Sequence, residues 1–116
     1  PLQLHGDGMQ TRDFTYIQNV VQANLKALFA SVTDLHTVMN IACGDSISLN
    51  QIIQKIQELS PEKTVNVEKH PTRSGDIKNS LADFNRATSI IQYSPQIFFE
   101  EGFKKTFEWF KSKFNN

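Results

Sequence analysis

Two short segments that combine glycine, arginine and aspartate constrain this chain more than any other feature. The first runs from Gly6 to Tyr16 with the sequence GDGMQTRDFTY, and the second, RSGD, runs from Arg73 to Asp76. Only three of the twelve basic residues are arginines, and two of these three lie in the segments. A guanidinium is a planar, permanently charged fork that fits phosphate oxygens, so the pair predicts a clamp on an anion such as a diphosphate. The alternative is that each arginine only braces a turn through its aspartate.

The composition argues against several other classes of function. Twelve acidic residues balance twelve basic ones, so no bulk charge favours nucleic acid or a membrane surface. No apolar run approaches the length of a membrane span. The single cysteine, Cys43, excludes an internal disulfide, fits a reducing cytoplasm and is expected to be a small buried filler. His5, His36 and His70 lack metal-ligand spacing, so no metal site is expected, although His5 lies close enough to the first segment to line its rim.

Hydrophobic periodicity predicts four helices. Ser48 and Gln51 form a capping box that opens one of them, and Pro61 stops it. The last helix carries a stripe of phenylalanines, which is typical of a core or an interface. The other predicted features are a helix from about Asn19 to Ala30 with Asn19 as its N-cap, a short helix capped by Asp83, and a final stripe of Phe99, Phe103, Phe107, Phe110 and Phe114.

Short strands are predicted between the helices. Leu2 to Leu4 is strand-like and is followed by a turn at Gly6 to Gly8. A β-branched run predicts a strand at Thr37 to Ile41. Alternation predicts another at Thr64 to Val67, which ends at His70-Pro71. The chain is therefore expected to mix helices with short strands.

The order of these motifs resembles the C-terminal part of the extended short-chain dehydrogenase/reductase family, the nucleotide-sugar epimerases and dehydratases. The resemblance runs from Gly6 to about Trp109. The motif sequences are most similar to those of UDP-N-acetylglucosamine 4-epimerases, with UDP-glucose 4-epimerases as near relatives. The matching pieces are Gly6-Asp7-Gly8, Thr11 to Ile17 (TRDFTYI), Asn19 to Asn24 (NVVQAN), Asn40 to Gly44 (NIACG), Ser48 to Gln51 (SLNQ), Arg73 to Asp76 and Ser80 to Asp83 (SLAD).

This resemblance implies an α/β fold class, the C-terminal substrate-binding portion of an extended Rossmann-type enzyme, with four main helices and short strands. Residues from about 18 to 44 are expected to complete the edge of the Rossmann domain. Residues 1–17 and 45–116 are expected to build the substrate domain. An abrupt start at Pro1 also favours a fragment of a longer protein.

We expect no catalytic residue and no cofactor site in this chain. A dinucleotide site needs a glycine-rich turn between a strand and a helix, but Gly6 to Gly8 is followed by Thr11-Arg12-Asp13 rather than an apolar helix. The family's catalytic tyrosine is followed four residues later by lysine, and neither Tyr16 nor Tyr93 has a lysine at that spacing. NAD and the chemistry are expected from a missing N-terminal domain.

Five substrate-binding residues follow from the resemblance. Arg12 and Arg73 would contact the diphosphate, each held by an acidic neighbour. Asp76 would bond either the ribose hydroxyls or Arg12. Phe14 and Leu49 would line the same pocket, with plain core packing as the alternative for both.

The resemblance also implies a function for the full-length protein. The strand at Leu2 to Leu4 would bond uracil through its backbone, and NAD would take a hydride from the sugar C4 and return it to the other face. The expected enzyme is thus a cytoplasmic, homodimeric UDP-sugar 4-epimerase, with UDP-glucose or UDP-N-acetylglucosamine as substrate. Alternatives are a 4,6-dehydratase, a decarboxylase, or a non-enzymatic interaction module. The chain alone is expected to be inactive and to self-associate, with neither nucleic acid nor a membrane as partner.

Overall fold

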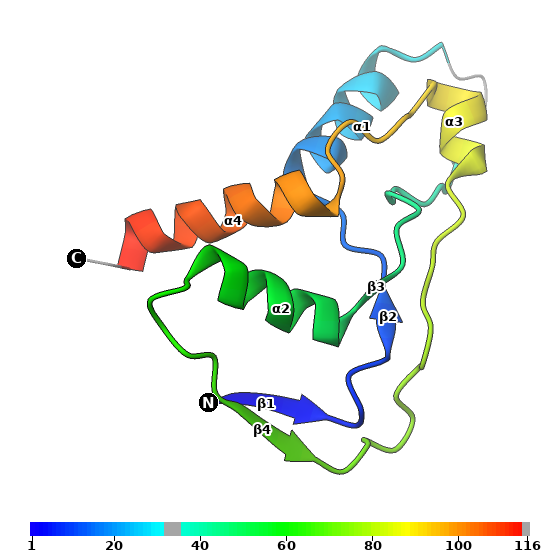
Figure 1. Cartoon of the computed structure of the whole chain (residues 1–116). Coiled ribbons are helices and arrows are strands. Elements are labelled where there is room, and N and C mark those ends of the chain that lie inside the picture. The colour runs from blue at the N-terminus through cyan, green and yellow to red at the C-terminus, as the bar shows by residue number, and fades with distance from the viewer. Residues whose placement is uncertain (32–35, 115–116) are drawn as a thin grey trace. The chain divides into compact units, whose positions relative to one another are not determined.

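The computed structural model describes residues 1–31 and 36–114, which divide into two compact units (Figure 1). The first unit contains residues 1–12 and 46–80, and the second contains residues 13–45 and 81–116 as far as they are described. This division reflects contacts within the chain alone. The assignment of residues 18–44 to a Rossmann edge, and of the rest to a substrate domain, stays a prediction, and positions 32–35 and 115–116 of those ranges lie outside the described residues.

The first unit contains two small sheets. Strand β1 (Leu2–His5) pairs in parallel with β4 (Val67–His70), as Figure 1 shows, and the register places Leu2 opposite Val67 and His5 opposite His70. Strand β2 (Thr11–Arg12) pairs antiparallel with β3 (Ile47–Ser48). Both segments with glycine, arginine and aspartate therefore begin just after a strand of this unit. The prediction of a strand at Leu2 to Leu4 is confirmed.

Helix α2 (Leu49–Leu59) follows β3 without a break and begins at the predicted capping box. The Ser48 hydroxyl accepts a hydrogen bond from the Gln51 backbone N–H at 3.2 Å, and the Gln51 side chain accepts one from the Ser48 N–H at 2.8 Å. The helix ends two residues before Pro61, as predicted. Its apolar residues are half-buried. Local sequence signals therefore decide both ends of α2.

The strand before the second arginine segment begins later than predicted. It was expected at Thr64 to Val67, but β4 spans Val67–His70. The side chain of Gln57 on α2 is hydrogen-bonded to the backbone that precedes β4. Its Oε1 accepts from the Val65 N–H at 2.9 Å, and its Nε2 donates to the Lys63 carbonyl at 2.8 Å. These groups are thus bonded to a helix side chain instead of a neighbouring strand.

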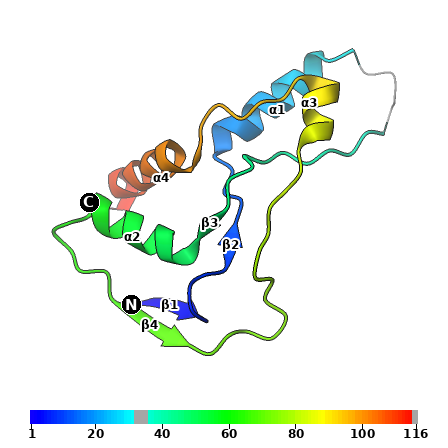
Figure 2. The ribbon, with the colours of Figure 1, turned by 45° about the vertical axis from the view of Figure 1, so that its right-hand side comes forward.

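The second unit packs helices α1 (Ile17–Phe29), α3 (Asn85–Ile91) and α4 (Phe99–Phe114). In it α3 lies beside α1 (Figure 2), and their shared core consists of Ala23, Ala87, Ile91 and Tyr93. The Tyr93 hydroxyl donates to the buried Ala42 carbonyl at 2.9 Å. None of the helices in the described ranges is long and apolar enough to cross a membrane. The predicted mixed α/β class with four helices and short strands is confirmed for the described residues.

Asn19 does not cap α1, contrary to the prediction. The helix begins at Ile17, and the capping position is held by Tyr16 without a side-chain hydrogen bond. Asn19 is instead 1% exposed. Its Oδ1 accepts from the N–H groups of Gln96 and Ile97 at 3.0 and 3.1 Å, and its Nδ2 donates to the Ile97 carbonyl at 2.6 Å. A buried amide must satisfy its polar atoms, and here a distant loop supplies the partners.

The predicted strand at Thr37 to Ile41 is also wrong. None of these residues joins a ladder with another strand among the described residues. Met39 and Ile41 pack against the core cluster of the second unit, whereas Val38 is 80% exposed. A β-branched run favours an extended backbone, but a strand also requires a partner for its N–H and C=O groups.

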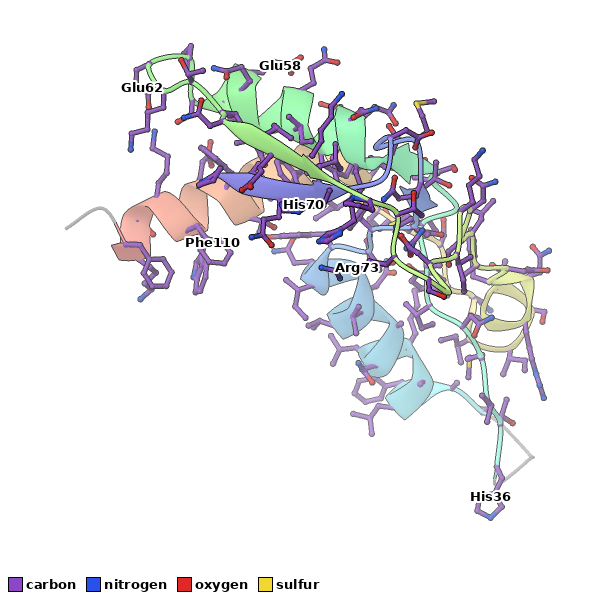
Figure 3. The ribbon with its side chains drawn as sticks, turned by 90° about the horizontal axis from the view of Figure 1, so that it is seen from below. His36, Glu58, Glu62, His70, Arg73 and Phe110 are labelled. Atoms are coloured by element: carbon purple, nitrogen blue, oxygen red, sulfur yellow. The ribbon has the colours of Figure 1, made fainter. Side chains whose placement is uncertain are left out.

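The phenylalanine stripe of α4 divides into a buried and an exposed part. Phe99 is 6% exposed and packs against Phe103 at a centroid distance of 5.2 Å, whereas Phe110 is 52% and Phe114 70% exposed. Figure 3 shows Phe110 projecting from α4. The prediction of a core stripe is therefore confirmed at the N-terminal end of the helix, and its alternative role as an interface stays a prediction at the other end.

Candidate functional site

Arg12 is held in one position by three hydrogen bonds of equal length. Its Nη1 donates to the carbonyls of Thr11 and Ile77 at 2.7 Å each, and its Nη2 donates to Asp76 Oδ1 at 2.7 Å. About a third of the Arg12 side chain and a quarter of the Asp76 side chain are exposed, at 32% and 26%. A guanidinium carries five N–H donors, so the Nε–H and one Nη2–H of Arg12 remain for a ligand. The sequence left two roles open for Asp76, and the structure shows the bond to Arg12.

Backbone pairing fixes the segment that carries Asp76. The Thr11 N–H donates to the Lys78 carbonyl at 2.8 Å, and the Thr11 carbonyl accepts from the Ser80 N–H at 3.1 Å. Thr11 thus also forms a parallel bridge with Asn79. Because β2 is paired on its other side with β3, Thr11 lies between two neighbouring segments. The Arg12–Asp76 pair is therefore built on a rigid backbone.

Arg73 differs from Arg12 in its surroundings. It lies exposed in the loop after β4, where Figure 3 labels it, and its guanidinium has no hydrogen-bond or ion-pair partner within residues 1–31 and 36–114. The Asp76 N–H donates to the Arg73 carbonyl at 3.2 Å, and Gly75 has a φ of +81°, so the RSGD segment is a tight turn. The expectation that an acidic neighbour holds Arg73 is wrong, because Asp76 is committed to Arg12.

A hollow of about 350 Å³ joins the predicted residues of the first unit. Leu49, Arg73 and Asp76 all line it, and Arg12 is attached to it through Asp76. Its other walls are Gln3, His5, Gln10, Ser74 and Gly75. The predicted location of His5 at the rim is thus confirmed. We call this space the β1 hollow, because β1 forms one of its sides.

Phe14 belongs to the second unit. Its ring packs against Phe99 at a centroid distance of 6.0 Å, and it lines an apolar pocket of about 240 Å³ with Tyr16, Gly102 and Phe103. The side chain is 36% exposed. Its predicted contact with the substrate stays a prediction.

Gln10 is a site residue that the sequence did not single out. It is 8% exposed, and its Nε2 donates to the His5 carbonyl at 2.6 Å. The same side chain lines both the β1 hollow and a neighbouring hollow of about 460 Å³ that includes Lys69, His70 and Lys78. A glutamine in a polar turn carries no periodic signal, so only the fold places it between the two hollows.

The Asp13 carboxylate and the Cys43 thiol have structural roles. The Asp13 carboxylate accepts from the N–H groups of Cys43 and Gly44 at 3.1 and 2.9 Å. Burial raises the pKa of the Cys43 thiol, which fits the predicted filler. Within the described ranges no group of three or more histidine, cysteine or acidic residues is arranged to hold a metal ion.

Within the described residues, the geometry brings Arg73 and Asp76 to one hollow, with Arg12 bonded to Asp76 and strand β1 at its side. A family model described as GDP-mannose 4,6 dehydratase matches residues 1–106. The chain belongs to this family. The resemblance to nucleotide-sugar epimerases and dehydratases is confirmed.

Two curated relatives and two solved structures illustrate this membership. The chain is 34% identical over 113 residues to a UDP-glucuronate 4-epimerase of Thermodesulfobacterium geofontis, covering 96% of this chain and 33% of that protein. It is 34% identical over 115 residues to a UDP-N-acetyl-alpha-D-glucosaminuronate decarboxylase of Bacillus cytotoxicus, covering 95% of this chain and 35% of that protein. The chain thus spans about a third of the length of these relatives.

The solved structures match the fold over the same range. A UDP-glucose 4-epimerase of Thermotoga maritima with UDP-glucose has a TM-score of 0.82 and 32% identity, over 96% of this chain and 35% of that one. A UDP-glucuronic acid 4-epimerase of Bacillus cereus, in complex with UDP-glucuronic acid and NAD, has a TM-score of 0.87 and 30% identity, over 97% and 35%. The fold therefore corresponds to the C-terminal part of such Rossmann-type enzymes.

Proposed function

We propose that this chain is the part of a longer NAD-dependent enzyme that binds the UDP half of a nucleotide sugar. The observation that carries the proposal is the β1 hollow. Its wall carries the Arg73 guanidinium, which has no partner among the described residues, and the Arg12–Asp76 pair lies at its side. A diphosphate offers several anionic oxygens to such donors. Arg73 would bind them with its whole fork, and Arg12 would add its two remaining N–H groups.

The free edge of β1 would receive the nucleobase. The Leu2 and Gly6 N–H groups donate to the Asn66 and His70 carbonyls along β4. In a parallel strand the backbone groups of alternate residues point to opposite sides, so those of Gln3 and His5 point away from β4. Both residues line the hollow. Uracil carries an N–H donor beside a carbonyl acceptor, and the adjacent C=O and N–H of Gln3 offer the complementary pair.

Asp76 would contribute to the ribose as well as to Arg12. Its Oδ1 accepts from Arg12, which leaves Oδ2 to accept from ribose hydroxyls. Leu49 would supply an apolar wall next to the base. Together with Arg12 and Arg73, these residues make up the substrate contacts that we propose for the first unit.

The described residues of this chain do not fit NAD. Its positive-φ glycines at positions 6 and 8 lead into strand β2, and no strand among the described residues is joined to a helix by a glycine-rich turn that could hold a pyrophosphate. NAD would therefore be held by another part of the longer enzyme, where it exchanges a hydride with the sugar C4. This chain would contribute only binding and orientation of the UDP-sugar, and alone it would be inactive.

The reaction we propose for the longer enzyme is 4-epimerisation of a UDP-sugar, with UDP-glucose or UDP-N-acetylglucosamine as substrate. Decarboxylation is a second candidate, because the decarboxylase relative is as similar to this chain, at 34% identity, as the epimerase relative. The two reactions share the UDP-binding half, so the residues described above fit both.

A titration of the isotope-labelled 116-residue chain with UDP, followed by nuclear magnetic resonance, tests the proposal. We expect saturable shifts at the amides of Gln3, Gly75 and Asp76 with a dissociation constant of about a millimolar or weaker, because half of the pocket is missing. Arg73→Ala should abolish the shifts, and Arg86→Ala, which removes an exposed arginine from α3, should keep them. CDP should bind less tightly, because cytosine presents no N–H at ring position 3. Equal responses of the two variants would contradict the proposal.

A further inference from the structure

The start of helix α2 is bonded to the loop that precedes Arg12. The first two N–H groups of the helix, those of Leu49 and Asn50, donate to the carbonyls of Gln10 and Gly8 at 3.2 and 3.0 Å. The Asn50 side chain adds a second attachment, because its Nδ2 donates to the Asp7 carbonyl at 3.1 Å and contacts Met9 Sδ at 3.6 Å. Helix N-terminal N–H groups need acceptors, and here the Asp7–Gln10 loop supplies them.

Gly8 fits this attachment because it has no side chain. Its φ is +77°, and a Cβ built on it would lie 2.1 Å from Asn50 Oδ1, far inside van der Waals contact. The Asn50 amide therefore occupies the space that any other residue at position 8 would fill. Gly75, which has a φ of +81°, has open space at the same place, so a positive φ does not by itself bring a close neighbour.

The attached loop leads directly into the β1 hollow. Gln10, at its end, lines the hollow, and the next two residues pair with the strand before α2, Thr11 with Ser48 and Arg12 with Ile47. Positions 8 to 12 are thus fastened to one continuous stretch, positions 47 to 50. Pairing of β2 with β3 holds positions 11 and 12, and the hydrogen bonds of Asn50 hold the loop before them.

We infer that Asn50 is a positioning residue, whose side-chain amide holds the Asp7–Gln10 loop so that Gln10, on the wall of the β1 hollow, and Arg12, bonded to Asp76 beside it, keep fixed positions. This inference rests on the proposed function. Asn50 itself does not line the β1 hollow. It acts through the loop, and its loss should loosen the site without removing any group that contacts the ligand.

Asn50→Asp separates this role from helix stability. A carboxylate cannot donate to the Asp7 carbonyl, so the loop loses its side-chain attachment. A negative charge in the first turn of α2 interacts favourably with the helix dipole, so the helix itself is not weakened. We expect an unfolding midpoint that is unchanged or higher, faster hydrogen exchange at positions 49 and 50, and a UDP dissociation constant raised roughly three- to tenfold, as for one lost hydrogen bond.

Gln54→Ala is the matched control, because Gln54 is exposed on α2 and its side chain donates to Glu58 on the same helix, away from the Asp7–Gln10 loop. It should leave both the exchange and the UDP affinity unchanged. A wild-type chain that does not respond to UDP contradicts the proposed function and this inference with it. A wild-type chain that binds UDP no more tightly than the Asn50→Asp chain contradicts this inference alone, and so does slow exchange at positions 49 and 50 in the variant.

Discussion

Asp76 accepts a hydrogen bond from Arg12 at 2.7 Å, and this pair joins two segments that lie 64 residues apart in the chain. The guanidinium also donates to the Thr11 and Ile77 carbonyls, so most of its freedom is removed before any ligand arrives. Arg73, on the same hollow, has no such bonds in the described part of the chain. One arginine is therefore preorganised, and the other is free to adapt to the ligand.

Asp76→Asn tests the preorganised arginine. Asparagine keeps the shape but replaces a charge-assisted hydrogen bond by a neutral one, so we expect the chain to lose about 1 kcal/mol of stability. Binding of UDP should weaken as well, because Arg12 is held less firmly and the ribose hydroxyls lose a charged acceptor. Chemical denaturation and the UDP titration measure the two effects. An unchanged affinity would show that Arg12 needs no fixed position.

Arg73→Lys tests the adaptable arginine. We expect no change in stability, because the guanidinium has no hydrogen bond or ion pair with any described residue. In the longer enzyme Arg73→Ala should weaken UDP-sugar binding by roughly 1.5–3 kcal/mol, the usual loss of a charged hydrogen bond, and lysine should recover only part of it. Steady-state kinetics report the change as KM and kcat. Unchanged values in the alanine variant would remove Arg73 from the site.

Gly8→Ala and Gly75→Ala form a matched pair. Both glycines have a positive φ, so each alanine should cost about 1 kcal/mol of backbone strain. Only Gly8→Ala also places a methyl group on Asn50, so it should cost more, roughly 2–4 kcal/mol in all. Thermal unfolding of the two variants measures the difference. Equal losses would mean that the loop moves away from Asn50 without resistance.

The buried hydroxyl of Tyr93 leads us to expect a loss of stability at high pH. Burial raises the pKa of its hydroxyl to about 12, from an ordinary value of 10.0. Because the folded state holds the proton more tightly, this contribution to stability is complete below pH 10 and disappears as the pH rises towards about 12. Unfolding experiments across that window should show the decline, and Tyr93→Phe should reduce it. The same variant should cost about 1 kcal/mol at neutral pH, because the hydrogen bond to Ala42 is lost.

The apolar surface of α1 predicts self-association of the chain. Val21 and Leu25 are 50% and 52% exposed, and Leu28 and Phe29 follow at 73% and 80%. Such a patch favours contact with another copy, as does the unpaired run at Thr37 to Ile41. Sedimentation should show dimers or larger assemblies, and Leu25→Glu should shift them towards monomers. A monomeric wild-type chain at high concentration would contradict this expectation.

The features that were predictable from sequence depend on residues close together in the chain. The capping box at Ser48 and the stop before Pro61 involve groups within one turn, so their residue types are sufficient. The turn at the RSGD segment is equally local. Arg12, Leu49, Arg73 and Asp76 were assigned by motif, and the structure brings the last three to one hollow, with Arg12 bonded to Asp76.

The features that were missed depend on partners far away in the chain. The residue type and position of Asn19 predict a helix cap, yet its side-chain amide is hydrogen-bonded to a loop about 78 positions later. The run at Thr37 to Ile41 has strand-like residues without a strand to pair with in the described chain. The hydrogen bonds of Gln10 and Asn50 correspond to no periodic pattern in the sequence from which they could be predicted.

The sequence by itself determined the residue types of the site, the local turns and helix ends, and the family. Only the tertiary structure decided which arginine Asp76 holds, because the two candidates, Arg12 and Arg73, differ in nothing but where the fold carries them. The physical reason is that a side chain's intrinsic chemistry is set by its type, whereas its partner is set by backbone pairing. Here the pairing of β2 with β3, and of Thr11 with positions 78 to 80, brings Arg12 to the carboxylate and leaves Arg73 without a partner among the residues that the structure describes.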